Sequence, residues 1–208
     1  MIEKEAMYKL TYGLFVLTTK DGDKDNGCIV NTVSMITDNP KRVTVYVNKS
    51  NYTEELIQKT GVFNACILTE SAPFETYKQF GFCSGRDTDK FAGKVYPRTE
   101  NGLYYIEEGC NAVISAKVVE KLDVGTHTLF VAEVTEAKVL GGGKSVTYEY
   151  YQTNVKPKPQ AAPTVEEPQA QAVEKWVCSV CGYEHEGALP DDFVCPWCKH
   201  GAADFVKQ

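Results

Sequence analysis

Four cysteines near the C-terminus form two Cys-x-x-Cys pairs, Cys178 with Cys181 and Cys195 with Cys198. A two-residue spacer lets a tight turn direct both thiolates of a pair toward one point. Gly182, directly after the first pair, can take a positive φ at little cost. Two such turns facing each other build a tetrahedral site of four sulfurs, which suits zinc or iron. The spacing alone leaves the choice between the two metals open.

The metal is expected to act as the core of a small C-terminal domain, residues 175–208, because so short a segment cannot bury enough apolar surface to fold unaided. Aromatic side chains are expected around it: Trp176, Tyr183, Phe193, Trp197 and Phe205. The other four cysteines have no mutual metal-ligand spacing. Cys66 and Cys110 lie in apolar runs and are expected in the core, whereas Cys28 and Cys83 are assigned no chemistry.

A second group of polar residues precedes a predicted helix over residues 52–61. The stretch NKSNYT places these polar side chains at the helix N-terminus: Lys49, Ser50, Asn51 and Thr53. Free backbone N–H groups and the positive end of the helix dipole suit a phosphate there. The same stretch also fits ordinary capping, in which Asn51 and Glu54 bond to the first turn. From the residues alone, both interpretations stand.

Three further motifs carry polar side chains at places where a ligand could be held. VNTVS contributes Asn31, Thr32 and Ser34; SGRDTDKF contributes Ser84, Gly85, Arg86 and Lys90; GTHTLF contributes His127. Taken by composition, these are also consistent with a half-buried strand, a solvated loop and a structural histidine. A Gly-x-Gly-x-x-Gly sequence after a strand is absent, so a Rossmann nicotinamide domain is not predicted.

The elements that must position these residues are mostly strands. Runs rich in β-branched and aromatic residues predict strands over 13–20, 27–37, 42–48, 63–68, 110–122 and 127–140. Asp21–Gly27 reads as a hairpin or a short loop. Two short helices are predicted, 52–61 and 74–81, each ending at a glycine. The fold class is therefore mainly β, a barrel with short helices.

The chain divides near residue 155. Residues 156–174 contain four of the nine prolines and no aromatic residue, which indicates a Pro-rich linker. The expected organisation is a large domain over 1–155, the linker, and the metal domain over 175–208. The net charge of −6 argues against nucleic-acid binding, and no apolar run is long enough to span a membrane. The charged N-terminus lacks a secretory signal, so a cytoplasmic location with reduced thiols is expected.

The C-terminal segment resembles rubredoxin, in the short form found at the end of rubrerythrins. The matching features are the aromatic-Val-Cys opening at Trp176, Cys-Gly-Tyr after the first pair, Pro190 before two aspartates, Cys-Pro-x-Cys, and the closing Phe205. The resemblance implies a single iron held by Cys178, Cys181, Cys195 and Cys198. A zinc ribbon that docks a partner is the alternative.

The large domain resembles the flavin reductase family, whose fold is an FMN-binding split β-barrel. The resemblance runs from about Tyr8 to Tyr151 and rests on the stretch from Gly27 to Leu68, on FGFCSGRDTDKF and on GTHTLFVAEV. It implies an FMN site made of the polar motifs above, with the phosphate at NKSNYT and the ring beside VNTVS. It also implies a catalytic His127 near flavin and nicotinamide, and a homodimer with FMN at its interface. The family commonly has Asp before this histidine, where Thr126 stands here.

The two resemblances together imply an NAD(P)H-oxidising flavoprotein that passes electrons from FMN to its own rubredoxin iron. This architecture is similar to that of the high-molecular-weight rubredoxin family of anaerobic bacteria, which implies a flavodiiron O₂ or nitric oxide reductase as partner. One alternative is a plain flavin reductase with a zinc-stabilised tail. Another is a flavin-binding module whose zinc ribbon docks a partner without catalysis.

Overall fold

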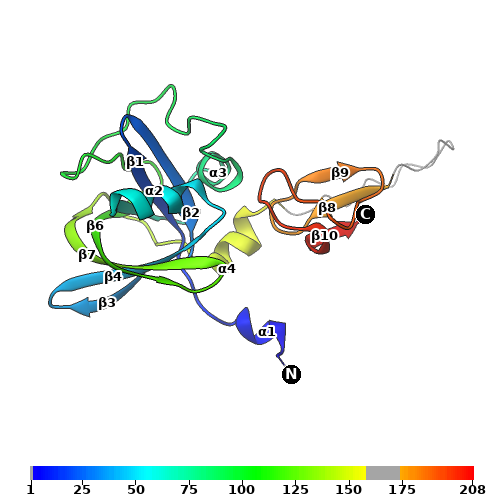
Figure 1. Ribbon diagram of the computed structural model, residues 1–208, viewed down its shortest axis with the longest axis horizontal. Helices are drawn as coiled ribbons and strands as arrows, with labels where there is room; N and C mark the ends of the chain where they lie inside the picture. The colour runs from blue at the N-terminus through cyan, green and yellow to red at the C-terminus, as the bar shows by residue number, and fades with distance from the viewer. Residues whose placement is uncertain (1, 158–173) are drawn as a thin grey trace. The chain divides into compact units, whose positions relative to one another are not determined.

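The structure is a computed structural model that describes residues 2–157 and 174–208 (Figure 1). The chain forms two compact units, Met1–Asn154 and Val155–Gln208. The linker expected over residues 156–174 lies almost wholly outside the described residues. Among those residues, no helix has the length and apolar character needed to cross a membrane.

The first unit is built on one antiparallel seven-stranded sheet with the strand order β2-β1-β5-β6-β7-β4-β3. Its strands are β1 (Phe15–Asp21), β2 (Lys24–Val30), β3 (Ser34–Asp38), β4 (Lys41–Asn48), β5 (Val62–Leu68), β6 (Cys110–Asp123) and β7 (His127–Val139). The helices are α1 (Lys4–Met7), α2 (Tyr52–Thr60), α3 (Phe74–Tyr77) and α4 (Tyr148–Tyr150), with π-helical turns η1 (Lys78–Phe82) and η2 (Tyr151–Val155). The unit is thus mainly β with short helices, as predicted.

The core of this unit lies between the curved sheet and α2. Fully buried aliphatic and aromatic side chains come from β1, β4, β5 and β7: Leu17, Val45, Val47, Phe63, Ala65, Phe130 and Ala132. Ile57 brings α2 onto the same cluster. The helix then ends at Gly61, whose φ of 69° places it in the left-handed region that glycine adopts without strain, as the sequence predicts.

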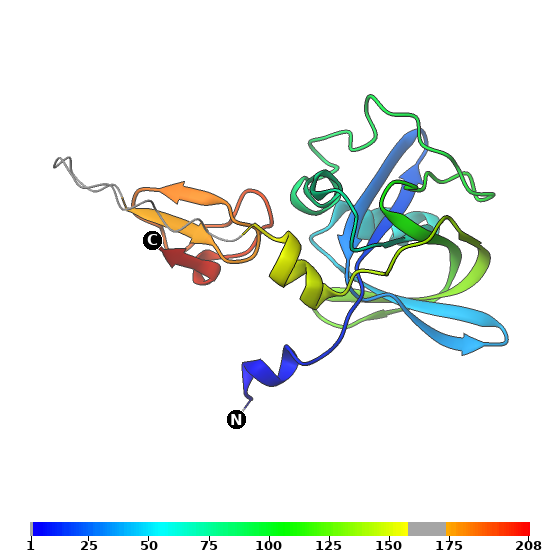
Figure 2. The ribbon, with the colours of Figure 1, turned by 180° about the vertical axis from the view of Figure 1, so that it is seen from behind.

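Two predicted elements differ in extent from the observed ones. The single strand expected over residues 27–37 is divided into β2 and β3, because the chain leaves one edge of the sheet at Val30 and joins the other at Ser34. The helix expected to end at Gly81 continues as η1 to Phe82. The β3–β4 hairpin extends beyond the rest of the sheet (Figures 1 and 2).

A long connection between η1 and β6 is tied to the sheet by polar side chains, one group buried and one at the surface. Asn64 on β5 is fully buried, donates to Thr99 Oγ1 at 2.8 Å and accepts from Asn101 Nδ2 at 2.9 Å. Arg98 forms a two-bond ion pair with Asp25, at 3.0 and 2.8 Å. These contacts hold an irregular segment against the sheet. The sheet in turn carries the neighbouring polar motifs.

The second unit contains a small antiparallel sheet with the order β10-β8-β9. Its strands are β8 (Lys175–Cys178), β9 (Glu184–Glu186) and β10 (Phe205–Lys207), and a 3₁₀ turn η3 (Ala202–Asp204) precedes the last. The strands are only three or four residues long. Such a sheet buries little apolar surface, so its two cysteine turns must be held together by something else.

Candidate functional sites: a four-thiolate centre and a polar cluster at α2

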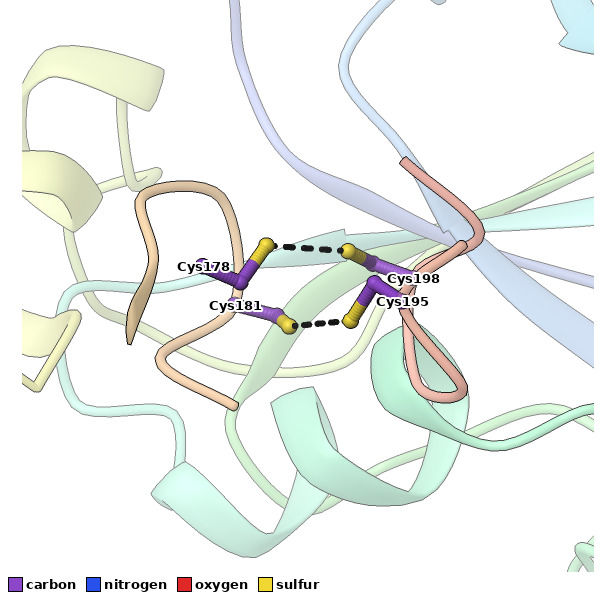
Figure 3. A group of neighbouring side chains, drawn as sticks. All are labelled: Cys178, Cys181, Cys195 and Cys198. Carbon is purple, nitrogen blue, oxygen red and sulfur yellow. Dashed lines mark hydrogen bonds between the residues drawn. The ribbon is translucent and has the colours of Figure 1, made fainter. Parts of the chain in front are cut away.

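The four C-terminal cysteines converge on one point. Their Sγ atoms all lie within 4.8 Å of one another, with Cys178 and Cys198 3.5 Å apart and Cys181 and Cys195 3.4 Å apart. Figure 3 shows the two turns facing each other, one pair of sulfurs from each. Four thiolates about 2.3 Å from a tetrahedral metal stand about 3.8 Å apart. The donor set therefore fits one metal ion.

Both cysteine turns share one backbone pattern. The N–H of the residue after each pair donates to the first cysteine's carbonyl: Gly182 to Cys178 at 2.8 Å, and Lys199 to Cys195 at 2.9 Å. Both of these residues have positive φ, 80° for Gly182 and 62° for Lys199. The glycine was predicted from the sequence. The lysine was not, because nothing in its type signals a left-handed conformation.

Burial and backbone N–H groups act on the cysteine sulfurs in opposite directions. Burial raises the pKa of the Cys195 thiol, and the N–H groups of Trp197 and Cys198, which donate to it, act in the opposite direction. Cys178, Cys181 and Cys195 are buried, whereas Cys198 is partly exposed. Buried sulfurs that accept backbone N–H bonds are suited to hold a cation that replaces their protons.

Aromatic rings pack in contact with one another in this unit. Tyr183 contacts Trp197, with ring centroids 5.3 Å apart, and Phe193 contacts Phe205 at 5.2 Å. Tyr183 also meets Phe205 edge-on at 6.4 Å. Trp176, expected in the same group, packs with its ring under Lys207 Nζ at 5.6 Å.

The second site lies at the first turn of α2. Asn51 stands at the N-cap position, yet its side chain makes no capping hydrogen bond within the described residues. Glu54 also does not cap: the Asn51 N–H donates to the Asn48 carbonyl at 2.9 Å, and Glu54 Oε1 accepts from Gln58 Nε2 at 3.1 Å and from the Thr128 hydroxyl. The capping pair allowed by the sequence is thus not formed. In the first turn, the Glu54 N–H donates to the Asn51 carbonyl at 3.0 Å. The N–H groups that precede it at a helix start have no acceptor within the helix, so this end is able to receive an anion.

Thr53, two residues further on, points inward. It is 1% exposed, and its Oγ1 accepts from Asn26 Nδ2 at 2.9 Å. The Cys28 thiol also lies within hydrogen-bonding contact of Thr53, and burial raises the pKa of that thiol. Thr53, one of the four polar side chains expected at this turn, is therefore buried and hydrogen-bonded to the sheet.

The SGRDTDKF segment closes over the same helix turn. Arg86 pairs with the Glu55 carboxylate, at 3.1 Å from Nη1 to Oε2, and its guanidinium lies 5.0 Å from the centre of the Tyr52 ring. This hydrogen-bonded pair lowers the pKa of Glu55. Ser84 accepts from the backbone N–H of Arg86 at 3.2 Å. The segment and α2 are thus joined at the surface.

Lys90 anchors the C-terminal part of the SGRDTDKF segment in the interior. Its side chain is 4% exposed, and Nζ donates to the carbonyls of Gly27 at 2.9 Å and Phe80 at 3.3 Å. Burial lowers the pKa of this ammonium. The structure therefore places Lys90 as an anchor between β2 and η1, whereas Arg86 is the cation at the surface.

The remaining predicted residues follow the course of β4. Ser34 is exposed and pairs with Thr44, and Thr32 Oγ1 donates to the Tyr46 carbonyl at 2.9 Å. His127 pairs with Asn48, at the end of β4 that leads into α2. Asn31 is half-buried at the β2–β3 junction. The sheet register thus brings the VNTVS, NKSNYT and GTHTLF motifs to β4 and the turn that follows it.

The ring of His127 is oriented by a hydroxyl group. Its Nδ1 lies 2.8 Å from Thr126 Oγ1. The carboxylate that commonly precedes this histidine in the family is replaced here by a neutral partner. The imidazole of His127 is therefore oriented by the neutral Thr126 hydroxyl and not by a carboxylate at that position.

A pocket of about 380 Å³ opens beside Lys49, between α2 and the adjoining ends of β6 and β7. Its lining is mostly charged or polar: Lys49, Glu54, Gln58, Lys121, Leu122, Asp123 and Thr128. Lys49 Nζ donates to Asp123 Oδ1 at 2.6 Å. The sequence did not indicate this pocket or the contacts of Asn26 and Glu55. Each depends on contacts between segments that lie far apart in the chain.

The fold and these two sites define a protein of two units, a β-sheet unit with polar side chains gathered at the first turn of α2 and a unit with four thiolates placed for one metal ion. The family described as "Flavin reductase like domain" matches residues 7–158, and "Rubrerythrin, rubredoxin-like domain" matches residues 176–206. The chain belongs to the flavin reductase-like family and carries a rubredoxin-like domain at its C-terminus. Its cofactors are FMN and one iron held by four cysteines, as predicted.

Relatives support both halves of this assignment. High molecular weight rubredoxin of Moorella thermoacetica is 38% identical over 99% of this chain and 100% of its own length. Ferric-chelate reductase (NAD(P)H) of Archaeoglobus fulgidus is 37% identical over 79% of this chain and 97% of its own. Flavoredoxin of Methanosarcina acetivorans superposes with a TM-score of 0.57 at 28% identity, over 65% of this chain and 74% of its own. The split-barrel prediction is confirmed, and the chain is an NAD(P)H-dependent oxidoreductase.

Proposed function

We propose that this chain oxidises NAD(P)H at FMN in its first unit and delivers the electrons, through the iron of its second unit, to a separate redox protein. One observation carries the proposal: a flavin reductase-like unit and a four-cysteine unit of rubredoxin type occur in one chain. FMN supplies two-electron chemistry with a nicotinamide, and thiolate-bound iron supplies one-electron chemistry. A chain that holds both cofactors converts two-electron transfer from a nicotinamide into one-electron transfer to a protein acceptor.

The proposed phosphate-binding residues are Lys49, Ser50 and Asn51, together with the first-turn N–H groups of α2. The support is that Asn51 makes no capping bond among the described residues, although it stands at the N-cap. Thr53 and Lys90 contribute by holding the surrounding segments, since both are buried and hydrogen-bonded inward. Lys49 would exchange Asp123 for the phosphate, because their ion pair is exposed and therefore weak.

The proposed ring-binding residues are Asn31, Thr32 and Ser34 on one side and Ser84, Gly85 and Arg86 on the other. A cation near the reduced ring stabilises its anionic form, and Arg86 is the cationic side chain of this segment that reaches the surface. His127 is the proposed catalytic residue. Its half-exposed ring, set by Thr126, is able to contact the nicotinamide or the flavin edge.

The proposed partners are a second copy of the chain and a flavodiiron protein. A homodimer is supported by apolar side chains left exposed on the β3–β4 hairpin, including Met35 at 69% and Ile36 at 47%. The flavodiiron partner follows from the high-molecular-weight rubredoxin resemblance. A cytoplasmic setting, where thiols remain reduced, suits the four-cysteine centre.

The experiment is an anaerobic titration of the purified full-length protein with NADH and NADPH. We expect flavin and ferric–thiolate absorption bands in the isolated protein, one iron per chain, and bleaching of both bands by at least one nicotinamide. A chain ending at residue 157 should still show flavin bleaching but should fail to reduce a one-electron protein acceptor. Zinc in protein from an iron-replete native host, or undiminished acceptor reduction after truncation, would contradict the proposal.

A second candidate activity is direct reduction of a ferric chelate by the first unit. The observation that favours it is the 37% identity to a ferric-chelate reductase over 79% of this chain. Ferric chelate reduction that is equally fast in the full-length and truncated chains would assign this activity to the first unit. Reduction that depends on the second unit would assign it to the iron.

A further inference from the structure

A buried asparagine joins the two segments around the α2 turn. Asn26, on β2, is 1% exposed and donates from Nδ2 to Thr53 Oγ1 at 2.9 Å. Its Oδ1 is buried and has no hydrogen-bond partner among the described residues. An uncompensated buried carbonyl is costly, so its presence calls for a physical reason.

The loop segment lies directly against that oxygen. A Cβ placed on Gly85 would stand 1.9 Å from Asn26 Oδ1, and Gly85 is itself buried. Any side chain at position 85 would therefore push the loop away from β2. Glycine is required at position 85 because the loop approaches Asn26 closely, and not because of its backbone φ.

We propose that Asn26 is a positioning residue for FMN, setting the spacing between the α2 first turn and the Ser84–Arg86 segment. This inference rests on the proposed flavin site, in which the α2 first turn binds the phosphate and the Ser84–Arg86 segment lies on one side of the ring. One end of the Asn26 amide holds Thr53, and the other supports the loop at Gly85. Asn26 would act through these neighbours, without touching the cofactor.

The surface contact between the same segments does not fix this spacing. The Arg86–Glu55 pair has side chains that are 44% and 48% exposed, and such pairs contribute little and are screened by salt. Flexible side chains also tolerate a shift of the loop. The Asn26 contact, by contrast, lies in a packed interior where a displacement of a few tenths of an ångström is resisted.

The test is a double-mutant cycle in the full-length protein, using Asn26→Ala, Gly85→Ala and the combination. FMN dissociation constants are measured by titrating apo-protein, and the melting temperature of the apo form is measured alongside. Gly81→Ala is the matched glycine control, because its Cβ would meet Ile29 at an ordinary 3.7 Å. If Asn26→Ala does not fold, Asn26→Ser replaces it.

We expect Asn26→Ala and Gly85→Ala each to weaken FMN binding about tenfold, and Gly81→Ala to leave it unchanged. In the Asn26→Ala background, Gly85→Ala should weaken binding less than about threefold, because the oxygen that obstructs the new methyl group is gone. Positions that act through one contact are non-additive in this way.

Two results would overturn the inference. One is an FMN affinity that is unchanged in Asn26→Ala or Asn26→Ser while the apo melting temperature falls, which would make Asn26 purely structural. The other is full additivity of the two substitutions. A native chain that binds no FMN would instead overturn the proposed function, so the two failures are distinguishable.

Discussion

At the scale of single residues, we propose different roles for neighbouring polar side chains at the α2 turn, one toward the cofactor and one toward the core. Asn51 has a side chain without a capping bond among the described residues, whereas Thr53 is buried and bonded to Asn26. We expect Asn51→Ala to weaken FMN binding with little change in apo stability. Thr53→Ala should destabilise the apo form by about 1–3 kcal/mol, because Asn26 Nδ2 loses its acceptor.

FMN titration and thermal unfolding of the apo form distinguish these two effects, and Thr53→Ser, which keeps the hydroxyl, is the control for Thr53. If Asn51→Ala lowers apo stability by about 1 kcal/mol with full FMN affinity, Asn51 is a helix cap after all.

A buried phenol makes the first unit sensitive to alkali. Tyr77 stacks on Tyr151 with ring centroids 4.9 Å apart, and its hydroxyl has no partner among the described residues. Burial is the main cause that raises the pKa of Tyr77 from 10.0 to about 12. The folded state therefore keeps this proton where the unfolded state loses it, and stability falls as pH rises from about 10 to 12.

Tyr77→Phe should remove this loss and cost little at neutral pH, because the deleted hydroxyl is unpaired. The measurement is the free energy of unfolding from pH 7 to 11.5 for the native and variant proteins, with exposed Tyr8→Phe as control. A large loss of stability in the variant at pH 7 would show that the hydroxyl has a partner.

At the scale of elements, the two cysteine turns offer a matched pair of substitutions. Gly182 and Lys199 occupy equivalent positions, both with positive φ. A left-handed conformation costs a non-glycine residue about 1–2 kcal/mol. Lys199→Gly should therefore stabilise the second unit by up to about 1 kcal/mol, and Gly182→Ala should destabilise it by a similar amount.

The temperature at which the iron–thiolate absorption is lost measures both effects. Substitution of Lys175 to Gly, in a strand, is the control that should destabilise. If Lys199→Gly and Gly182→Ala changed stability in the same direction, the two turns would not be equivalent.

The β3–β4 hairpin is the element on which the proposed dimer depends. Met35→Glu with Ile36→Glu should yield monomers and weaken FMN retention, because charges replace apolar contacts. Light scattering with FMN titration measures both, and Val95→Glu, at a residue 99% exposed, is the control. A native monomer that retains FMN tightly would contradict the dimer.

At the scale of the whole molecule, the two units are expected to lose structure independently. Their cores differ in kind, a packed sheet in one and a metal with short strands in the other. Removing the iron with a chelator should unfold the second unit and leave FMN bound to the first.

The chain's two tryptophans, Trp176 and Trp197, both lie in the second unit, so their emission reports that unit alone. We expect a red shift on iron removal and its reversal when iron is restored. FMN fluorescence should not change in parallel. Release of FMN together with the tryptophan shift would show that the units are thermodynamically coupled.

The sequence by itself determined what depends on local order. Cys178, Cys181, Cys195 and Cys198 were identified as one site, because a two-residue spacer fixes how a turn presents two thiolates. The α2 helix and its end at Gly61 follow from local propensity. Most strands follow from their β-branched runs, and the FMN and iron assignments came from extended resemblance.

Only the tertiary structure decided which polar groups face a ligand. Asn51 and Thr53 look equivalent in the sequence, but Asn26, 27 residues before Thr53, takes the threonine into the interior. Lys90 looks like a solvated cation, yet the carbonyls of Gly27 and Phe80 receive its ammonium. The break of the predicted 27–37 strand is likewise set by the sheet, whose two edges β2 and β3 occupy. Such contacts join residues far apart in the chain, so no local pattern encodes them.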